Sequence, residues 1–565
     1  MAETRARNAG HAFALVLVDE LTRHGVTDAV LAPGSRSTPI ALALAADERI
    51  RLHVRIDERS ASYVALGIAR TTGRPVPLLC TSGTATAHFH AAVLEADQSR
   101  IPLLVLTADR PPELRGVGAN QTVDQVGLYS SATRWSTDVG VPEARPESVR
   151  YWRSLVSRAV AVTLGRSGGP AGPVHLNLPL REPLTPADDG VGFPWPLDGR
   201  PDEAPWSASA SGATDVPREL AGLVEGSERG VLVAGDGLTG DDVAGLLRFA
   251  ADCGWPIIAE PHSNARRGDA LRAVDPLLSD KRFVDAYRPD LVVVAGRAGL
   301  TRPVLGWLAE QSSVVVDRDG EWADPTRSAR AVFRTSPGAL AACSAKAEAG
   351  WAEAWRDASA AAAAAIDEIL DASGLTEPRV ARDVAAATAS GGALVVASSM
   401  PIRDLDLTMR PRDDLRIVAN RGVSGIDGFV STAVGVALAH DGPTVALAGD
   451  LSLLHDANGL IADPAADLTL IVVNNNGGGI FSLLPQSGGD PATFERLFGT
   501  PHGVDIGRLA AAYGVRHSLV ATAADLCDAV SSRPRGISVV EVRTTRVANA
   551  ELHARLRVAA AQALS

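Results

Sequence analysis

Short runs of apolar, often β-branched residues alternate along this chain with longer segments whose apolar positions recur at helical spacing. A continuous apolar run that ends in Gly or Asn is typical of a strand buried in a parallel sheet. Strands that alternate with helices predict a mostly parallel sheet with helices on its faces. The first such runs are 29–31, 52–56, 76–80 and 103–106, between helical patterns at 12–24, 39–46 and 60–70.

The alternation occurs in three blocks, which predicts three consecutive doubly wound α/β domains. A stretch rich in Pro, Asp, Gly and Ser at 184–217 reads as a linker after the first block, and a charged, Ala-rich helix at 351–370 follows the second. A chain of 565 residues is long enough for three separate cores. The expected domains are 1–188, 205–345 and 370–565.

Composition and charge exclude several classes of protein. No run of 18 apolar residues occurs, so we expect no membrane span. The formal net charge of −12 argues against a nucleic-acid partner. The first residues contain no apolar signal core, and four cysteines are scattered without metal-ligand spacing. We therefore expect a cytoplasmic protein with free thiols.

An acid and an amide follow two neighbouring strand-like runs in the third block. Asp450 comes after the run 444–448, and Asn475 comes 25 residues later, after the run 468–473. The segment between them is long enough for a crossover helix, so both side chains reach the carboxyl edge of one sheet. Mg²⁺ prefers carboxylate, amide, carbonyl and phosphate oxygens. The pattern predicts a Mg²⁺ and diphosphate site, with Asp450, Asn475 and the Gly477 carbonyl as protein ligands.

A second Gly-Asp pair in the chain provides an internal comparison. Asp236 follows the strand-like run 231–234, but no strand that ends in Asn-Asn comes at the right distance after it. Gly-Asp pairs are common in ordinary turns. Asp236 is therefore interpreted as part of a structural turn.

Several motifs in the two terminal blocks resemble one enzyme family. Asp450 and Asn475 match the thiamine-diphosphate signature of Gly-Asp-Gly followed by Asn-Asn, although Leu451 replaces its second glycine. The chain resembles the 2-succinyl-5-enolpyruvyl-6-hydroxy-3-cyclohexene-1-carboxylate (SEPHCHC) synthase family of menaquinone biosynthesis. The resemblance is carried by Ala32–Pro39, Asp57–Arg59, Thr81–Ala85, Thr107–Leu114, Gly118–Gln121, Asn420–Gly428 and Asn474–Leu484.

The resemblance implies a cofactor, two substrates and self-association. The cofactors would be thiamine diphosphate and Mg²⁺, with Mn²⁺ as an alternative ion. The implied reaction is decarboxylation of 2-oxoglutarate, followed by conjugate addition of the resulting carbanion to isochorismate. The implied assembly is a homodimer or a dimer of dimers, in which Glu58 and Asp450 belong to halves of a site shared between subunits.

The resemblance also assigns residues to the cofactor. Glu58 would contact the ring nitrogen of the aminopyrimidine, and Ile426 would be the bulky side chain over which the two rings fold. Ser82 lies in a matched motif and is a further cofactor-binding candidate. Without the resemblance, a glutamate in Asp-Glu-Arg is usually a helix cap or an exposed pair.

Both implied substrates carry two carboxylates, which the planar fork of arginine binds well. The substrate candidates are Ser35, Arg36, Arg110, Gln121, Ser399, Arg403 and Arg421, with an apolar wall of Ile480, Phe481 and Leu484. Gln121, Arg403 and Arg421 join Glu58 as catalytic candidates, because the arginines could stabilise a growing enolate. The central block matches the family weakly, and the role of Arg302 stays open.

Three alternative functions are less well supported by the sequence. Another thiamine-diphosphate carboligase or 2-oxoacid decarboxylase acting on pyruvate would not need four matched arginines, because pyruvate has one carboxylate. A catalytically dead homologue would not need to retain Glu58, Asp450 and Asn475. A nicotinamide-dependent dehydrogenase lacks support, because no Gly-x-Gly-x-x-Gly motif opens a helix after a strand.

Overall fold

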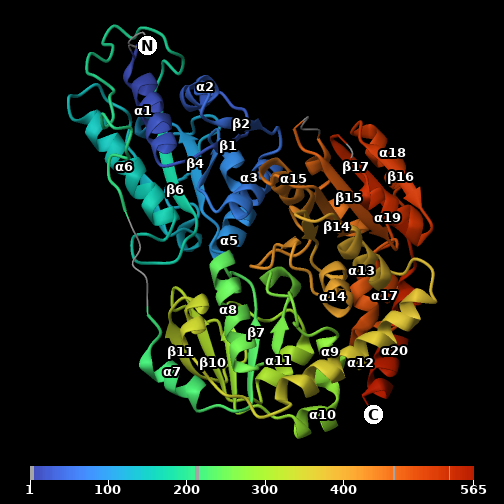
Figure 1. Ribbon diagram of the computed structural model, residues 1–565. Helices are drawn as coiled ribbons and strands as arrows, with labels where there is room; N and C mark the ends of the chain where they lie inside the picture. The colour runs from blue at the N-terminus through green and yellow to red at the C-terminus, as the bar shows by residue number, and fades with distance from the viewer. Residues whose placement is uncertain (1–5, 210–214, 462–464, 534, 565) are drawn as a thin grey trace. The chain divides into compact units, whose positions relative to one another are not determined.

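A computed structural model describes residues 6–209, 215–461, 465–533 and 535–564. It contains three parallel sheets of six, five and six strands (Figure 1). By their contacts the residues form two compact units. The first unit contains residues 1–212 and 422–440, and the second contains 213–421 and 441–565. The three parallel α/β sheets confirm the predicted fold class.

The N-terminal sheet has the strand order β2-β1-β3-β4-β6-β5, and all its pairs are parallel. Its strands are β1 (Asp28–Leu31), β2 (Arg51–Val54), β3 (Val76–Cys80), β4 (Leu103–Asp109), β5 (Trp135–Asp138) and β6 (Val174–Pro179). Its helices are α1 (Ala9–Arg23), α2 (Thr38–Ala46), α3 (Glu58–Thr72), α4 (Thr84–Ala87), α5 (His90–Gln98) and α6 (Ser148–Thr163), with short 3₁₀ turns at Pro112–Leu114 and Ser130–Ala132.

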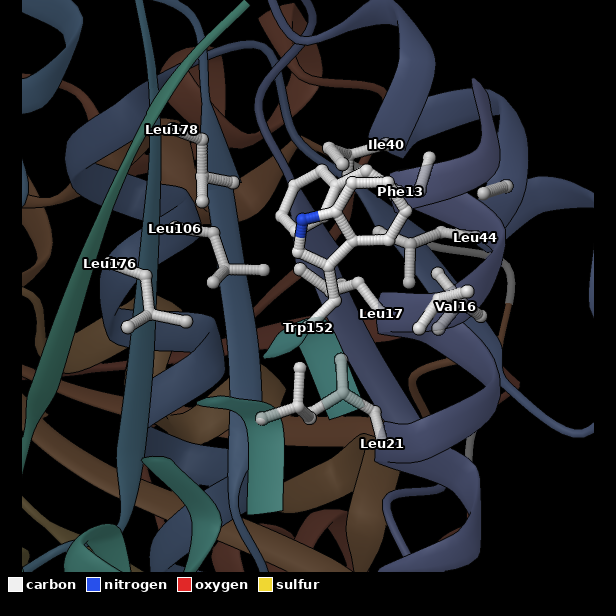
Figure 2. Close-up of a cluster of buried hydrophobic side chains, with 14 of the residues drawn as sticks. Phe13, Val16, Leu17, Leu21, Ile40, Leu44, Leu106, Trp152, Leu176 and Leu178 are labelled. Carbon is white, nitrogen blue, oxygen red and sulfur yellow. The ribbon is translucent and has the colours of Figure 1, made fainter. Parts of the chain in front are cut away.

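One face of this sheet is covered by α1, α2 and α6, which bury a shared apolar core (Figure 2). The α1 helix begins at the Asn8 cap, whose side-chain oxygen accepts a hydrogen bond from the His11 backbone N–H at 2.8 Å. Phe13 then packs edge to face against Trp152 of α6, with 5.4 Å between ring centroids. These rings lie over strand residues such as Leu106 and Leu176. The core fixes the strands whose ends carry the candidate residues.

The central sheet has the order β11-β10-β9-β7-β8. Its strands are β7 (Gly230–Ala234), β8 (Ile257–Ala259), β9 (Leu291–Ala295), β10 (Ser313–Asp317) and β11 (Ala329–Arg334). Its helices are α7 (Arg218–Glu225), α8 (Gly240–Cys253), α9 (Val274–Ser279), α10 (Lys281–Ala286) and α11 (Arg302–Leu308), with 3₁₀ turns at Pro261–Ser263 and Pro337–Ala342. The long helix α12 (Trp351–Asp371) follows and buries Trp355 completely.

The C-terminal sheet has the order β13-β12-β14-β15-β17-β16. Its strands are β12 (Ala393–Val396), β13 (Arg416–Val418), β14 (Thr444–Gly449), β15 (Leu468–Asn474), β16 (Arg516–Val520) and β17 (Ile537–Arg543). Its helices are α13 (Glu377–Ala387), α14 (Met400–Thr408), α15 (Phe429–Ala439), α16 (Asp450–His455), α17 (Pro491–Phe494), α18 (Ile506–Ala512), α19 (Ala523–Ser531) and α20 (Arg546–Ala563). Short turns of helix cover Ala457–Leu460, Gly479–Leu483, Pro485–Gly488 and Glu495–Gly499.

The terminal sheets share one strand order, in which the first and third strands of each lie side by side. Ligands of open α/β sheets bind outside the carboxyl ends of strands at such a reversal point. The equivalent crossover helices α3 and α15 also pack against each other. A Cβ added to Gly67 would lie 2.3 Å from the Thr432 carbonyl oxygen, and one added to Gly435 would lie 2.2 Å from that of Val64. Only glycine allows this close approach.

None of the described helices is both long enough and apolar enough to cross a bilayer.

Candidate functional site

Asp450 and Asn475 lie at the carboxyl ends of two paired parallel strands, as the spacing predicted. Gly449 of β14 is in register with Val473 of β15, so the residues that follow both strands emerge side by side. The Asp450 side chain is buried, and its Oδ1 accepts a hydrogen bond from the Leu451 N–H at 2.7 Å. Its Oδ2 accepts one from the Gly477 N–H at 2.9 Å. The carboxylate is therefore joined directly to the loop that follows β15.

The three consecutive asparagines after β15 differ in what their side-chain oxygens do. The Asn474 oxygen accepts from the Asn476 N–H at 3.1 Å, and the Asn476 oxygen accepts from the Gly503 N–H at 2.9 Å. Among the described residues, none donates a hydrogen bond to the buried Oδ1 of Asn475. A buried acceptor without a donor is costly unless a ligand satisfies it. Asn475 is thus the asparagine whose oxygen is available to a cation.

The oxygen donors present fit Mg²⁺. The Asp450 carboxylate supplies charge and the Asn475 amide supplies a neutral oxygen, which together suit a hard cation. The described part of the chain holds no cluster of three or more His, Cys, Asp or Glu that could form a different metal centre. Gly479 packs against the amide so closely that an added Cβ would lie 2.6 Å from Asn475 Nδ2. The side chain is therefore confined to one position.

Two neighbours of this pair were not predicted from the sequence. His502 places Nε2 3.2 Å from Asp450 Oδ2. Glu377, the first residue of α13, accepts a hydrogen bond from Asn475 Nδ2 at 2.9 Å. Burial, and then the negative charge of Asp404, raises the pKa of Glu377 to about 7. No sequence signal marks either residue, because Thr-Glu-Pro is an ordinary helix start and His502 lies in an irregular segment.

Glu58 is the first residue of α3 and follows the helix cap. The β2 strand ends at Val54, two residues earlier than the apolar run suggested, and Asp57 caps the helix by accepting from the Ser60 N–H at 3.2 Å. The capping role therefore belongs to Asp57, and the half-buried Glu58 side chain is left for other contacts. The negative charge of Glu58, after the effect of burial, helps to raise the pKa of Cys80 at the end of β3.

Ser82, Arg110 and Gln121 meet at the edge of the N-terminal sheet. The Ser82 hydroxyl donates to the Gln121 carbonyl oxygen at 3.1 Å, and Gln121 Nε2 donates back to the Ser82 carbonyl oxygen at 3.0 Å. Arg110 donates from Nη1 to the Ser82 hydroxyl. Gln121 adopts a φ of 54°, a strained conformation for a residue with a side chain. Turns far apart in sequence thus form one polar cluster.

Arg36 adds a second cation next to this cluster. Burial, and then the positive charge of Arg36, lowers the pKa of Arg110. Arg36 donates to the Leu180 carbonyl oxygen at 3.0 Å and lies 3.4 Å from the Glu182 carboxylate. The side chain of Ser35 is exposed beside it. Two arginines this close repel each other, so an anion between them would be stabilised.

Ile426 lies half-buried in the loop before α15. This loop is anchored by the buried Glu95 carboxylate, which accepts hydrogen bonds from the backbone N–H groups of Gly422, Val423 and Ser424 at 2.7–2.9 Å. Asp427 accepts a further hydrogen bond from the Tyr63 hydroxyl of α3. The loop that carries Ile426 therefore belongs to the same compact unit as Glu58.

A cavity of about 810 Å³ lies among residues of the central and C-terminal domains. Arg403, Ile480 and Leu484 line it together with Arg302, the residue whose role the sequence left open. Burial, and then the charge of Arg421, lowers the pKa of Arg403. The lining also contains the cationic side chains of Lys281, Arg282 and Arg557, the acids Asp275 and Asp280, and His553. The volume and the charge suit a small anionic ligand with apolar carbon atoms.

Of the six substrate candidates in or next to the C-terminal domain, three do not line this cavity. Arg421 donates from Nη1 to the Ser398 hydroxyl at 3.2 Å. Ser399 occupies the N-cap position of α14 with a φ of 75° and without a side-chain capping hydrogen bond, and its carbonyl oxygen accepts from Arg403 Nη1 at 2.7 Å. Phe481 packs against Phe498, with 5.6 Å between ring centroids. The expected apolar wall therefore consists of Ile480 and Leu484 at the cavity, because Phe481 turns to an aromatic partner.

Three protein-family models match consecutive parts of the chain. The N-terminal thiamine pyrophosphate binding domain matches residues 11–128, the middle domain of thiamine pyrophosphate enzymes matches 201–396, and the C-terminal thiamine pyrophosphate binding domain matches 407–542. Two solved structures share the fold at 19% identity. They are a benzoylformate decarboxylase from Polynucleobacter necessarius (TM-score 0.69, over 96% of this chain and 99% of that one) and a 4-hydroxybenzoylformate decarboxylase from Rhodococcus jostii (TM-score 0.68, over 94% and 99%).

Curated relatives cover nearly the whole chain, and each is named 2-succinyl-5-enolpyruvyl-6-hydroxy-3-cyclohexene-1-carboxylate synthase. The Thermobifida fusca protein is 53% identical over 99% of this chain and 100% of its own length. The Saccharopolyspora erythraea protein is 45% identical over 99% and 100%, and the Bacillus velezensis protein 39% identical over 96% and 96%. This chain therefore belongs to the SEPHCHC synthase family of thiamine pyrophosphate enzymes.

Proposed function

We propose that the protein decarboxylates 2-oxoglutarate and adds the resulting carbanion to isochorismate, forming SEPHCHC and CO₂ in menaquinone biosynthesis. The names of its relatives support this reaction, and they do not favour another thiamine-diphosphate carboligase. The observation that carries the proposal is the pair formed by Asp450 and Asn475 at the ends of β14 and β15, in which Asn475 Oδ1 accepts no hydrogen bond from any residue that the structure describes.

Asp450, Asn475 and the Gly477 carbonyl would hold Mg²⁺ or Mn²⁺ with the diphosphate of the cofactor. Bound thiamine diphosphate would supply the electron sink that makes loss of CO₂ from a 2-oxoacid feasible. Glu58 would hold a proton at the aminopyrimidine nitrogen, with Ser82 and Ile426 lining the cofactor. The half-buried position of Glu58 at the start of α3 supports that assignment.

The arginines would bind substrate carboxylates. Two anion-binding pairs are supported by the charge of Arg36, which lowers the pKa of Arg110 after the effect of burial, and by that of Arg421, which does the same to Arg403. Gln121 and Ser35 would contact substrate beside the first pair, and Ser399, Ile480 and Leu484 would shape the site around the second. Arg403 and Arg421 would also stabilise negative charge that develops on isochorismate.

We further propose that the enzyme works as a homodimer or a dimer of dimers in the cytoplasm, with each site shared between subunits. Large apolar side chains next to the candidate residues support self-association, because Ile56 is 72% exposed and Val117 is 67% exposed. All four cysteines are free thiols, which suits a reducing compartment.

One assay tests the reaction. Purified protein is mixed with isochorismate and either 2-oxoglutarate or pyruvate, with and without thiamine diphosphate and Mg²⁺, while CO₂ and product mass are measured. The expected result is CO₂ and SEPHCHC from 2-oxoglutarate only when both cofactors are present. Preference for pyruvate, or turnover without thiamine diphosphate, would overturn the proposal.

A further inference from the structure

Two adjacent asparagines, Asn474 and Asn475, are held by the same kind of contact. Asn474 donates from Nδ2 to Glu541 Oε1 of β17 at 2.8 Å, and Asn475 donates from Nδ2 to Glu377 Oε1 of α13 at 2.9 Å. Both glutamates are almost completely buried. The two amides differ in their oxygens, because that of Asn474 accepts a backbone hydrogen bond and that of Asn475 accepts none from the described residues.

Glu377 Oε1 accepts hydrogen bonds from both Asn475 Nδ2 and the Thr544 hydroxyl, so a proton bound to this acid would be on Oε2, and Oε1 distinguishes the two ends of the amide. If the Asn475 amide rotated by half a turn, its oxygen would face Glu377 Oε1 and repel it. Its NH₂ group would then occupy the position that now holds the buried oxygen, and an NH₂ group cannot bind a cation. The contact with Glu377 therefore favours the orientation of the Asn475 amide in which Oδ1, and not Nδ2, occupies the buried position available to a cation.

Glu377 is itself held in place by a second contact. Its Oε1 also accepts from the Thr544 hydroxyl at 3.0 Å, just after β17. Gly479 also packs close to the Asn475 amide, because an added Cβ would lie 2.6 Å from Nδ2. The glutamate is thus a fixed acceptor aimed at one nitrogen, which is the usual arrangement around metal ligands that must keep one orientation.

We propose that Glu377 is a positioning residue of the metal site, and that it fixes the Asn475 amide so that Oδ1 faces the cation that binds the cofactor diphosphate. This inference rests on the proposed function, because it assumes that Asn475 is a ligand. Glu377 does not touch the cation, and it acts through Asn475.

The first test replaces the acceptor with a group that can also donate. In Glu377→Gln, the introduced NH₂ can donate to the Asn475 oxygen and allow the reversed orientation. The probe is Mg²⁺ titrated against the whole protein with thiamine diphosphate, and heat of binding is measured by calorimetry. We expect Mg²⁺-dependent binding to weaken by roughly 10- to 100-fold. Electron paramagnetic resonance of Mn²⁺ in place of Mg²⁺ gives an independent measure of how readily each variant releases the ion.

Glu541→Gln is the matched control. This change makes the same Glu-to-Gln substitution at another buried site, next to Asn474, whose oxygen is already used by the backbone. Mg²⁺ affinity is expected to stay within about twofold of that of the unchanged protein, since Asn474 is not a ligand. An equal loss in both variants would mean that Glu377 has only a general structural role, and would overturn the proposal.

A charge exchange tests the positioning role even where the single variant folds poorly. A carboxylate at position 475 has two equivalent oxygens and needs no orientation, and the glutamine introduced at position 377 can donate to it. The double variant Glu377→Gln with Asn475→Asp should therefore bind Mg²⁺ at least about tenfold more tightly than the single variant Glu377→Gln. Failure of this rescue in a folded protein would contradict the proposal.

The unchanged protein separates this inference from the proposed function. The unchanged protein is expected to bind Mg²⁺ with thiamine diphosphate. If the affinities of Glu377→Gln for both are within about threefold of those of the unchanged protein, only the positioning role fails. If the unchanged protein binds neither, the proposed function fails as well.

Discussion

The N-terminal and C-terminal sheets have the same strand order, yet equivalent turns of the two sheets carry different chemistry. The turn after the third strand carries Ser82 in the N-terminal sheet and Asp450 in the C-terminal sheet. The turn after the fourth strand carries Arg110 in one and Asn475 in the other. Ser82 and Arg110 meet in a hydrogen bond, whereas Asp450 and Asn475 are the proposed oxygen ligands of a cation.

The comparison shows that the fold determines where side chains meet and the turn residues determine what they bind. In both sheets the third and fourth strands are parallel neighbours, so the residues that follow them emerge together. A hydroxyl and a guanidinium at that place suit an anion, while a carboxylate and an amide suit Mg²⁺. The central sheet differs, because Asp236 after its first strand β7 forms an ion pair at 2.7 Å with Arg297 after its third strand β9.

The largest expected effect separates chemistry from binding. Glu58→Gln in the N-terminal domain should lower kcat by about 10²- to 10⁴-fold, because proton transfer at the cofactor ring is lost. Affinity for thiamine diphosphate should change little, since the C-terminal turns hold the diphosphate. Steady-state kinetics and calorimetry measure the two quantities. Normal turnover in this variant would remove Glu58 from the proposed site.

Asp450→Asn should show the opposite pattern. The loss of the charged ligand should weaken Mg²⁺-dependent binding of thiamine diphosphate by at least about 100-fold. Asp236→Asn is the control, because it changes the same residue type in the same kind of turn of the central sheet. Calorimetry should show unchanged cofactor affinity in the control. Similar losses in the two variants would contradict the assignment of the metal site to the C-terminal sheet.

A smaller effect is expected for the anion-binding turn of the N-terminal sheet. Arg110→Lys keeps the charge but removes the planar fork, so KM for a dicarboxylate substrate should rise roughly 10- to 100-fold. Arg181→Lys, at an exposed ion pair with Glu113, should leave KM unchanged. Measurement of KM for each substrate separately would show which carboxylate Arg110 binds, and equal KM values in the two variants would remove Arg110 from the site.

The smallest effect concerns stability and comes from the central domain. Burial raises the pKa of Glu260 from 4.5 to about 7, although the N–H groups of Gly299 and Leu300 donate to it. The folded state therefore binds the proton more tightly than the unfolded state, and this contribution to stability is lost as the pH rises through about 7. Relative to Glu260→Gln, the protein should lose up to about 3 kcal/mol between pH 4.5 and pH 8.

Thermal unfolding of both proteins across this pH range measures that difference. Subtracting the unfolding free energy of Glu260→Gln from that of the unchanged protein removes the contribution of other titrating acids, because the glutamine oxygen can still accept from the N–H groups of Gly299 and Leu300. A difference that does not change with pH would show that Glu260 keeps the same protonation state in the folded and unfolded chains.

The sequence determined the three sheets and the pairing of Asp450 with Asn475. The run Val76–Cys80 is a strand with the predicted bounds, because a buried parallel strand must be apolar on both faces. The acid and amide could be paired because parallel strands end at the same edge. Short-range patterns were sufficient for both inferences.

The tertiary structure alone decided which neighbours complete the site. Glu377 and His502 reach Asn475 and Asp450 from 98 and 52 residues away along the chain, and Arg302 joins the cavity lined by Arg403. It also decided that Asn475, among three identical residues in a row, keeps a buried oxygen to which no residue in the described ranges donates. Such contacts depend on how separate elements pack, and no local pattern of residues specifies them.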